Sequence, residues 1–171
     1  MSMHPDKNYF KEFKGDCNCW IETGTCYGDG ITLAIQAGFT DIHSIDIVNV
    51  IPEWYKHELK YNTYIGDSAE VLSKILPGLK DKKIMFWLDA HSMLTEGEEE
   101  NYPLKREIDA IRKSGITDAT ILIDDLLYMT NPILTRLSFD ELKYSIQEIN
   151  WSYKFKLLSN PFVKNILLAY L

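Results

Sequence analysis

The stretch that decides the fold is Trp20-Ile-Glu-Thr-Gly-Thr-Cys-Tyr-Gly-Asp-Gly30, which runs directly into an apolar-periodic segment over residues 31–37. Its first residues are hydrophobic and end in a carboxylate, Glu22. Three glycines follow, and the periodic pattern then predicts a helix over residues 28–37. A strand, a glycine-rich turn and a helix in this order let the backbone come close to a nucleotide-like ligand.

The spacing of these glycines narrows the choice of ligand. It is G-x-x-x-G-x-G, whereas dinucleotide-binding turns have G-x-G-x-x-G. A carboxylate at the mouth of the turn would repel a pyrophosphate, but it suits a ligand that carries an ammonium group. S-adenosylmethionine, a nucleoside with an amino-acid tail, meets both requirements. The motif alone is also compatible with a glycine turn that binds no ligand.

Length, composition and charge limit the possible class of protein and its partners. The 171 residues are 46% hydrophobic, which predicts a single domain over residues 1–171 with a sizeable core. We expect a cytoplasmic protein without a membrane partner, because no segment is apolar enough to span a bilayer and residues 1–13 lack a signal-peptide core. Three cysteines are expected to be reduced thiols. The net charge of −7 disfavours a nucleic-acid partner, which requires a basic face.

Strand-like and helix-like segments alternate along the chain. Strands are predicted at residues 19–24, 42–47, 61–65, 84–89 and 120–125, helices at 28–37, 52–59, 69–76, 103–113 and 139–149, and an antiparallel hairpin at 153–158 and 163–170. This alternation predicts an α/β, Rossmann-like, doubly wound and mostly parallel seven-stranded sheet with a C-terminal antiparallel β-hairpin. Residues 1–18 are a lead-in segment, whose aromatic side chains either pack on the domain or form part of a lid.

Acidic side chains follow all five predicted parallel strands. In such sheets ligands bind outside the carboxyl ends of the strands. Asp46 lies where an acidic residue can accept both ribose hydroxyls, and Asp67-Ser68 lies where the adenine edge would fall. Tyr27, in the turn, is expected to close over the methionine tail.

Three further carboxylates, Asp89, Asp124 and Asp125, would converge from adjacent strands. Hard oxygen ligands of this kind suit Mg²⁺ or a similar divalent ion. Unit charges about 4 Å apart repel by about 4 kcal/mol at an effective dielectric near 20, a cost that a dication would remove. The alternative is that Asp124 caps the next turn and Asp125 faces solvent.

His91 is the candidate general base. It stands two residues beyond Asp89 at the end of a buried strand, and its ordinary pKa near 6.5 allows it to take a proton from an activated hydroxyl. The competing interpretation is that His91 stacks on or hydrogen-bonds the adenine. His4, His43 and His57 lack such a context and are predicted to be surface or packing residues, and Trp87 is predicted to be core.

Taken together, the motifs resemble class I S-adenosylmethionine-dependent methyltransferases, above all the small O-methyltransferase group that includes catechol O-methyltransferase and the macrolide- and aminocoumarin-sugar O-methyltransferases. The segments that carry the resemblance are Ile21-Glu-Thr-Gly-Thr-Cys-Tyr-Gly-Asp-Gly30, Ser44-Ile-Asp-Ile47, Gly66-Asp-Ser-Ala-Glu-Val-Leu72, Phe86-Trp-Leu-Asp-Ala-His91 and Ile121-Leu-Ile-Asp-Asp125. Their order and spacing are more specific than any one of them. The final hairpin looks like the sixth and seventh strands of that fold.

The resemblance implies roles for individual residues. The methionine moiety is held by residues 22–28, the ribose by Asp46 and the adenine side by Ser68; the Mg²⁺ ligands are Asp89, Asp124 and Asp125. The full set of cofactor-binding residues implied is Glu22, Thr23, Gly24, Thr25, Tyr27, Gly28, Asp46, Asp67, Ser68 and Asp89. His91 occupies the position where sugar-modifying members carry an acidic base. Ser92 stands nearest to the lysine base of the catechol enzymes, which disfavours a catechol acceptor.

The sequence therefore predicts a Mg²⁺-assisted O-methyltransferase with Asp89 and His91 as catalytic residues, acting on a hydroxyl of a sugar or nucleotide-sugar. Its acceptor pocket is open, built from residues 9–14, or completed by a partner subunit of a homo-oligomer. An NAD-type oxidoreductase is opposed by the glycine spacing and by Glu22. A catalytically silent methyltransferase-like binding module is the second alternative. A nucleic-acid methyltransferase is opposed by the acidic charge and by Asp89-Ala-His, where an Asn/Asp-Pro-Pro-aromatic motif would stand.

Overall fold

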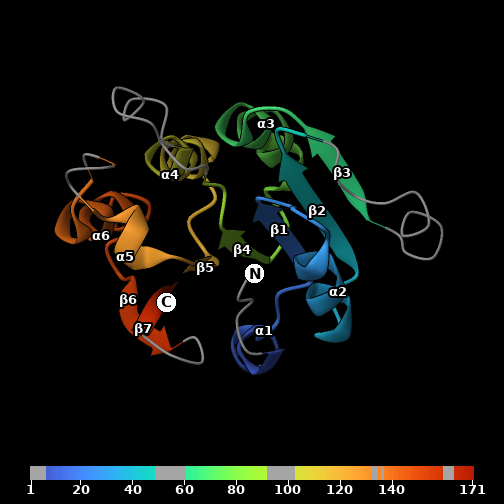
Figure 1. The fold of residues 1–171 in the computed structure, drawn as a ribbon, viewed down its shortest axis with the longest axis horizontal. Helices are drawn as coiled ribbons and strands as arrows, with labels where there is room; N and C mark the ends of the chain where they lie inside the picture. The colour runs from blue at the N-terminus through green and yellow to red at the C-terminus, as the bar shows by residue number, and fades with distance from the viewer. Residues whose placement is uncertain (1–6, 49–60, 92–102, 132–134, 136, 160–163) are drawn as a thin grey trace.

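One seven-stranded sheet forms the centre of the molecule, with the strand order β3-β2-β1-β4-β5-β7-β6. The structure is a computed structural model that describes residues 7–48, 61–91, 103–131, 135, 137–159 and 164–171 (Figure 1). The strands are β1 (Cys19–Thr23), β2 (Asp41–Asp46), β3 (Asn62–Ile65), β4 (Ile84–Leu88), β5 (Ala119–Ile123), β6 (Lys154–Ser159) and β7 (Lys164–Tyr170). The helices are α1 (Lys7–Phe13), α2 (Asp29–Gln36), α3 (Ser68–Ile75), the 3₁₀ turn η2 (Leu76–Leu79), α4 (Pro103–Ser114), α5 (Leu126–Met129) and α6 (Phe139–Gln147).

Strand directions confirm the predicted fold class. β1 to β5 pair in parallel, whereas β7 lies antiparallel between β5 and β6. A dinucleotide-binding Rossmann sheet has the order 3-2-1-4-5-6 and no inserted antiparallel strand. The position of β7 therefore separates this sheet from the Rossmann sheet itself.

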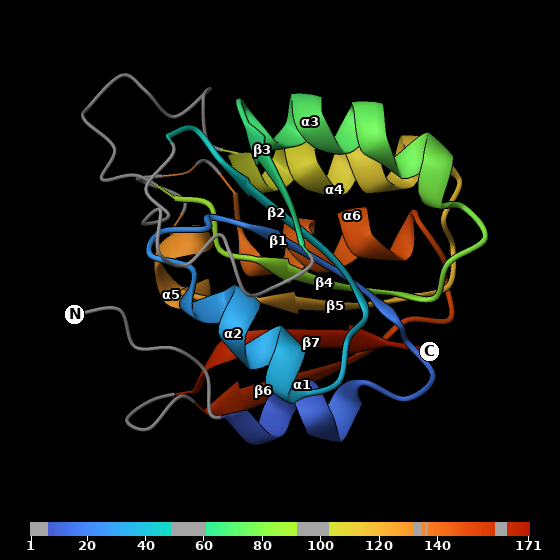
Figure 2. The same ribbon diagram turned by 90° about the vertical axis from the view of Figure 1, so that its right-hand side faces the viewer.

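Helices cover both faces of the sheet (Figure 2). On one face α3, α4 and α6 bury Leu72, Ile108 and Ile146 in a single apolar cluster. On the other face α1 and α2 bury Phe10 and Ile31 in a second cluster. The central strands β1 and β4 are buried along their whole length, as is typical of a parallel sheet with two covered faces.

The lead-in helix α1 packs on the domain. Phe10 is fully buried and meets the rings of Trp20 and Trp87 edge-on, at centroid distances of 5.6 and 5.3 Å. Tyr9 donates from its hydroxyl to the carbonyl of Ser159 at 2.7 Å. Of the two alternatives for these aromatic residues, packing is confirmed for Phe10, and the expected core position of Trp87 is confirmed as well.

Side-chain caps mark the starts of two predicted helices. Asp67 caps α3 by accepting from the N–H of Glu70, and Ser138 caps α6 in a capping box with Glu141. The short helix α5 was not predicted. The expected helix at 52–59 lies outside the described residues. None of the helices in the described ranges combines the length and the apolarity needed to cross a bilayer.

Candidate functional site

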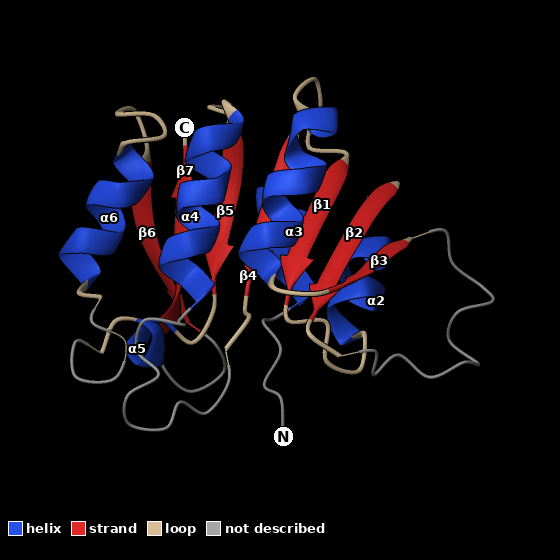
Figure 3. Cartoon of the chain, turned by 90° about the horizontal axis from the view of Figure 1, so that it is seen from above, coloured by secondary structure: helices blue, strands red, loops and turns tan. Residues whose placement is uncertain are grey.

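The carboxyl ends of the parallel strands meet along one edge of the sheet (Figure 3). Hydrogen bonds extend the strand ladder beyond the strand ends: the N–H of Gly24 donates to the Ile45 carbonyl at 2.8 Å, that of Asp89 to the Thr23 carbonyl at 3.1 Å, and that of Asp124 to the Leu88 carbonyl at 3.1 Å. The ends of β1, β4 and β5 are thereby held in one row. The acidic side chains predicted from the strand ends do gather here.

The turn after β1 depends on backbone conformations that favour glycine. Gly24 has φ 84°, and a Cβ at this position would lie 2.6 Å from the carbonyl oxygen of Asp89. Gly28, with φ 86°, is the N-cap of α2. Between them Cys26 has φ 45°, which is uncommon for a residue with a side chain. The backbone of the turn therefore lies directly against the end of β4.

Glu22 lies beneath this turn. Its side chain is buried, with the residue only 1% exposed, and it accepts a hydrogen bond from the Ser44 hydroxyl, which also pairs with the Thr25 hydroxyl at 2.6 Å. Burial raises the pKa of Glu22 well above its ordinary value, and the negative charge of Asp89 adds to the effect. A side chain at Gly30 would collide with the Glu22 carboxylate, so α2 begins directly over it. Glu22 thus faces Ser44 and the first turn of α2.

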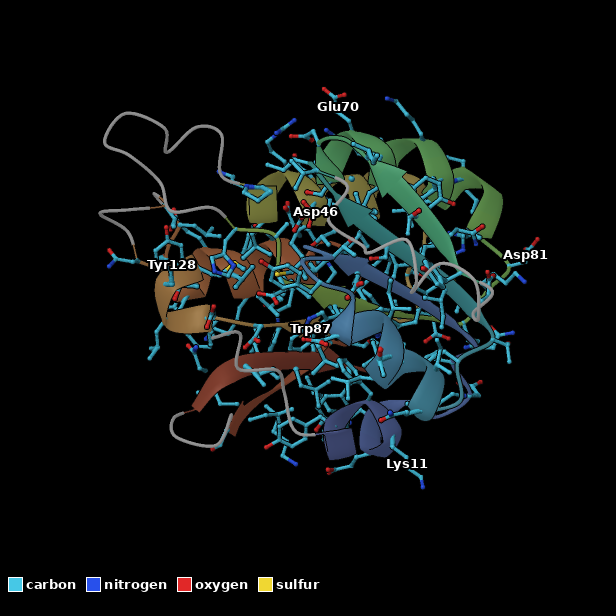
Figure 4. The ribbon with its side chains drawn as sticks, turned by 45° about the vertical axis from the view of Figure 1, so that its right-hand side comes forward. Lys11, Asp46, Glu70, Asp81, Trp87 and Tyr128 are labelled. Carbon is cyan, nitrogen blue, oxygen red and sulfur yellow. The ribbon has the colours of Figure 1, made fainter. Side chains whose placement is uncertain are left out.

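Asp46 and Tyr27 border the same turn from outside. Asp46, at the end of β2, accepts from the N–H of Cys26 at 2.9 Å and from that of Val48 at 3.2 Å (Figure 4). Asp46 is therefore in direct contact with the glycine-rich turn, where a ribose role would require it. Tyr27 is 69% exposed, so its ring is available to a ligand above the turn.

Asp67 and Ser68 connect the end of β3 to α4. Arg106 donates to Asp67 at 2.7 Å; although burial opposes it, the hydrogen bonds from the Glu70 N–H and from Arg106 lower the pKa of Asp67. The buried Ser68 hydroxyl donates to Glu107 at 2.5 Å. Both predicted residues thus lie at the expected strand end, each with a partner on α4.

Glu107 itself was missed by the sequence reasoning. It is only 1% exposed, also hydrogen-bonds the side chain of Thr23, and burial raises its pKa to about 7. A signal was present, because Glu107 shares the buried stripe of α4 with Leu104, Ile108 and Ile111. An acid at a core position of an amphipathic helix indicates a buried carboxylate that needs hydroxyl partners.

Asp89, His91 and Asp125 form a polar cluster on this edge. His91 Nδ1 lies 3.4 Å from a carboxylate oxygen of Asp89 and 3.1 Å from its carbonyl, and Nε2 lies 3.3 Å from Asp125. The hydrogen bond to Asp89 is the main cause that raises the pKa of His91 to about 8. The ring of Tyr128, on α5, lies 5.5 Å from the imidazole (Figure 4). The predicted pair of Asp89 and Asp125 is therefore close together, with His91 between them.

Asp124 differs from its neighbours. It is buried, and its side chain accepts from the N–H of Asp125 at 2.8 Å. Burial, followed by repulsion from Asp89, raises the pKa of Asp124 to about 7. In the described part of the chain, the group of possible ligand atoms within 4.8 Å of one another at this edge consists of Asp89, His91 and Asp125, without Asp124.

Asn165 fixes the position of the Asp125 side chain by a hydrogen bond. Asp125 has φ 46°, and its side chain accepts from Asn165 Nδ2 at 2.9 Å, while the Asn165 amide oxygen accepts from the Leu127 N–H at 2.8 Å. Asn165 comes from β7, and Tyr128 from the unpredicted α5. Neither contact has a signal in local sequence, because each depends on how distant elements pair.

The donor set fits a divalent cation in two ways. Asp89 and Asp125 with waters would suit Mg²⁺, leaving the imidazole of His91 free. All three side chains together would suit a transition metal, since imidazole is a ligand of Zn²⁺ and similar ions. In both arrangements the cation offsets the repulsion between two carboxylates.

No protein-family model matches the sequence, and a search of curated proteins finds no match. Solved structures are similar in fold. MycE, from the mycinamycin biosynthetic pathway and in complex with Mg, SAH and mycinamycin VI, superposes with a TM-score of 0.65 at 14% identity over 96% of this chain and 47% of its own. The chain has the class I methyltransferase fold. It spans about half the length of MycE.

Two further solved structures are similar in fold. A SAM-dependent methyltransferase from Archaeoglobus fulgidus gives a TM-score of 0.57 at 12% identity, covering 96% of this chain and 94% of that one. The Bordetella bronchiseptica enzyme WbmH in complex with NAD⁺ gives 0.56 at 12% identity, covering 78% and 53%. At these identities the likeness concerns the fold.

Proposed function

We propose that the protein is an S-adenosylmethionine-dependent O-methyltransferase that acts on a hydroxyl of a small molecule, a sugar or nucleotide-sugar, with a divalent cation held by Asp89 and Asp125. One observation carries the proposal: the glycine-rich turn and the Asp89–His91–Asp125 cluster share one edge of the sheet, with Gly24 against the Asp89 backbone. A donor held by the turn would thereby lie next to an acceptor held at the cluster.

The donor side is built from the turn and its supports. Thr23, Gly24, Thr25 and Gly28 would present the backbone to the methionine moiety. Glu22 would act through the Ser44 hydroxyl, which hydrogen-bonds both Glu22 and Thr25. The remaining donor contacts would come from Tyr27, Asp46, Asp67 and Ser68. MycE, which is similar in fold, binds SAH and Mg, and this likeness supports the same pair of ligands here.

The acceptor side is built around His91. A cation at Asp89 and Asp125 would supply Lewis-acid polarisation of the acceptor hydroxyl. His91 takes the hydroxyl proton while the oxygen attacks the methyl carbon, so that the O–CH₃ bond forms as the S–CH₃ bond breaks and the sulfur leaves as a neutral thioether. Asp89 orients the imidazole through Nδ1, and a cation that engaged the Asp125 carboxylate would leave Nε2 of the neutral ring to take the proton. Alignment of the two reactants is expected to supply most of the rate enhancement. Vicinal hydroxyls, as in a sugar, could both reach the cation.

An NAD-type oxidoreductase is the second candidate, because WbmH binds NAD⁺ on a similar fold. Two features oppose it. The antiparallel β7 between β5 and β6 departs from the Rossmann order, and the carboxylates around the turn disfavour a pyrophosphate.

Calorimetry with S-adenosylhomocysteine and with NAD⁺ separates the two. We expect binding of S-adenosylhomocysteine alone; binding of NAD⁺ alone would overturn the proposal, and binding of neither would favour a silent module. A methyl-transfer screen over nucleotide sugars and phenols, with Mg²⁺ or with chelator, then tests the acceptor. Asp125→Asn and His91→Gln should lose transfer, whereas Asp81→Asn, an exposed carboxylate far from the cluster (Figure 4), should not. Full activity in chelator would remove the cation from the proposal.

A further inference from the structure

A second polar cluster lies at the opposite end of the sheet, where β1 and β2 begin. Cys19 is the first residue of β1, and Asp41 and His43 are the first and third residues of β2. The parallel register pairs Cys19 with Asp41, and because side chains alternate along a strand, Asp41 and His43 share one face. Possible ligand atoms of all three residues lie within 4.8 Å of one another.

The three side chains are tied together through the carboxylate of Asp41. The thiol of Cys19, which is fully buried, hydrogen-bonds Asp41, and His43 Nε2 lies 3.1 Å from Asp41 Oδ1. The other imidazole nitrogen, Nδ1, lies 2.9 Å from the hydroxyl of Tyr64. Lys82 approaches the second oxygen of Asp41 at 3.5 Å. Two hydrogens, one from sulfur and one from nitrogen, therefore point at the same carboxylate.

We propose that Cys19, Asp41 and His43 form a zinc-binding site at the base of β1 and β2. Bond lengths of 2.0–2.3 Å in a tetrahedral zinc site place the ligand atoms about 3.3–3.6 Å from one another. The Nε2–Oδ1 distance of 3.1 Å is close to that separation, and the Cys19 sulfur lies within 4.8 Å of both atoms. The Asp41 side chain is 27% exposed, which gives the ion a route from solvent and leaves room for a water as fourth ligand.

The protonation chemistry of the cluster is compatible with zinc. Burial lowers the pKa of His43, so the imidazole is neutral and can bind through Nε2. Its proton moves to Nδ1, where the Tyr64 hydroxyl switches from donor to acceptor and fixes the ring, as outer partners of metal-bound histidines do. Cys19 loses its proton to the buffer, so binding of one zinc ion releases one proton. Burial raises the pKa of the Cys19 thiol to about 12, and zinc must therefore displace this proton.

The charges also balance. A thiolate and a carboxylate together neutralise the dication, and the half-exposed Lys82 can turn its ammonium group to water. The sulfur ligand distinguishes this site from the Asp89–His91–Asp125 cluster, which offers only oxygen and nitrogen atoms. Because thiolate is a soft ligand, the site at Cys19 should select zinc over Mg²⁺.

Cobalt(II) tests the site, because only a thiolate ligand gives a sulfur-to-cobalt charge-transfer band in the near ultraviolet. We expect the full-length protein to bind one cobalt ion with this band and zinc to displace it. Cys19→Ser and His43→Gln should lose the band, whereas Cys17→Ser, Cys26→Ser and Asp125→Asn should keep it. Zinc should raise the melting temperature of Asp125→Asn, in which the other cluster is impaired, and adding His43→Gln to this variant should remove the rise.

Absence of the band in the wild type would overturn the proposal, as would its persistence in Cys19→Ser. Should Cys19→Ser fail to fold, His43→Gln and Asp41→Asn decide: a band of wild-type intensity in both would place the ion elsewhere. None of these measurements depends on methyl transfer, so the zinc site and the proposed function can fail separately.

Discussion

Replacement of Gly24 by alanine tests whether the turn after β1 is shaped by its contact with β4. Two costs are expected. The left-handed backbone conformation, with φ 84°, should cost about 1–2 kcal/mol for a residue with a Cβ. The new methyl group would lie 2.6 Å from the Asp89 carbonyl oxygen, and the backbone shift needed to relieve this overlap should cost about 1–3 kcal/mol more. We therefore expect Gly24→Ala to lower the free energy of unfolding by about 2–5 kcal/mol.

Gly38→Ala is the matched control. Gly38 has φ 85°, but a Cβ there would meet no atom within 4 Å, so only the conformational cost of about 1–2 kcal/mol applies. The lower entropy of the unfolded chain with alanine affects both variants alike. Urea unfolding measures both free energies, and calorimetry measures the affinity for S-adenosylhomocysteine, which only Gly24→Ala should weaken. Equal losses of stability in the two variants, with equal affinity, would refute the reasoning.

Further predictions concern three buried residues. Burial raises the pKa of Glu107 from 4.5 in the unfolded chain to about 7, so its contribution to stability is present below pH 4.5 and is lost as the pH rises to 7. Between pH 5 and 8 the free energy of unfolding of Glu107→Gln should therefore increase by up to about 3 kcal/mol relative to wild type. Urea unfolding measures this increase, and the exposed control Glu70→Gln should not show it. Asn165→Ala should weaken cation binding at Asp125 by about 10–100-fold in calorimetry, and unchanged affinity would contradict its positioning role. Phe10→Ala should lower the free energy of unfolding by about 3–5 kcal/mol with donor affinity unchanged, which would exclude a role of Phe10 in a lid.

Periodicity and end signals were sufficient to predict the seven strands and the helices α2, α3, α4 and α6. β4 is almost wholly apolar because both of its faces are covered, and α6 begins where the capping box of Ser138 and Glu141 requires. The four-residue α5 was missed because one helical turn is too short for periodicity to register. Its N-cap, Asp125, has a left-handed conformation and lacks a side-chain cap hydrogen bond, so the usual start signal is absent.

The sequence predicts which strand ends form the candidate site, but it does not predict which side chains come into contact there. Strand ends converge in any parallel sheet, so the order of the strands already places Asp89 and Asp125 on one edge. Which atoms approach one another depends on side-chain direction, so the sequence left open whether Asp124 joins the other carboxylates or caps the next turn. In the structure Asp124 accepts from the Asp125 N–H, and His91 joins Asp89 and Asp125 instead. Glu107 and Asn165 reach the site from α4 and β7, and tertiary packing alone decides their positions.

The electrostatics of this edge point to a positively charged partner. Burial raises the pKa values of Glu22, Glu107 and Asp124, and the charge of Asp89 raises each of them further. Protonation is one way to relieve this repulsion, and a cationic ligand is the other. A sulfonium donor with an ammonium group and a divalent ion would both lower it, whereas a pyrophosphate would increase it. Glu22 was first interpreted as a direct partner of the ammonium group; because it is buried beneath the turn, its charge would act on such a ligand through Ser44, Thr25 and the field of the whole edge.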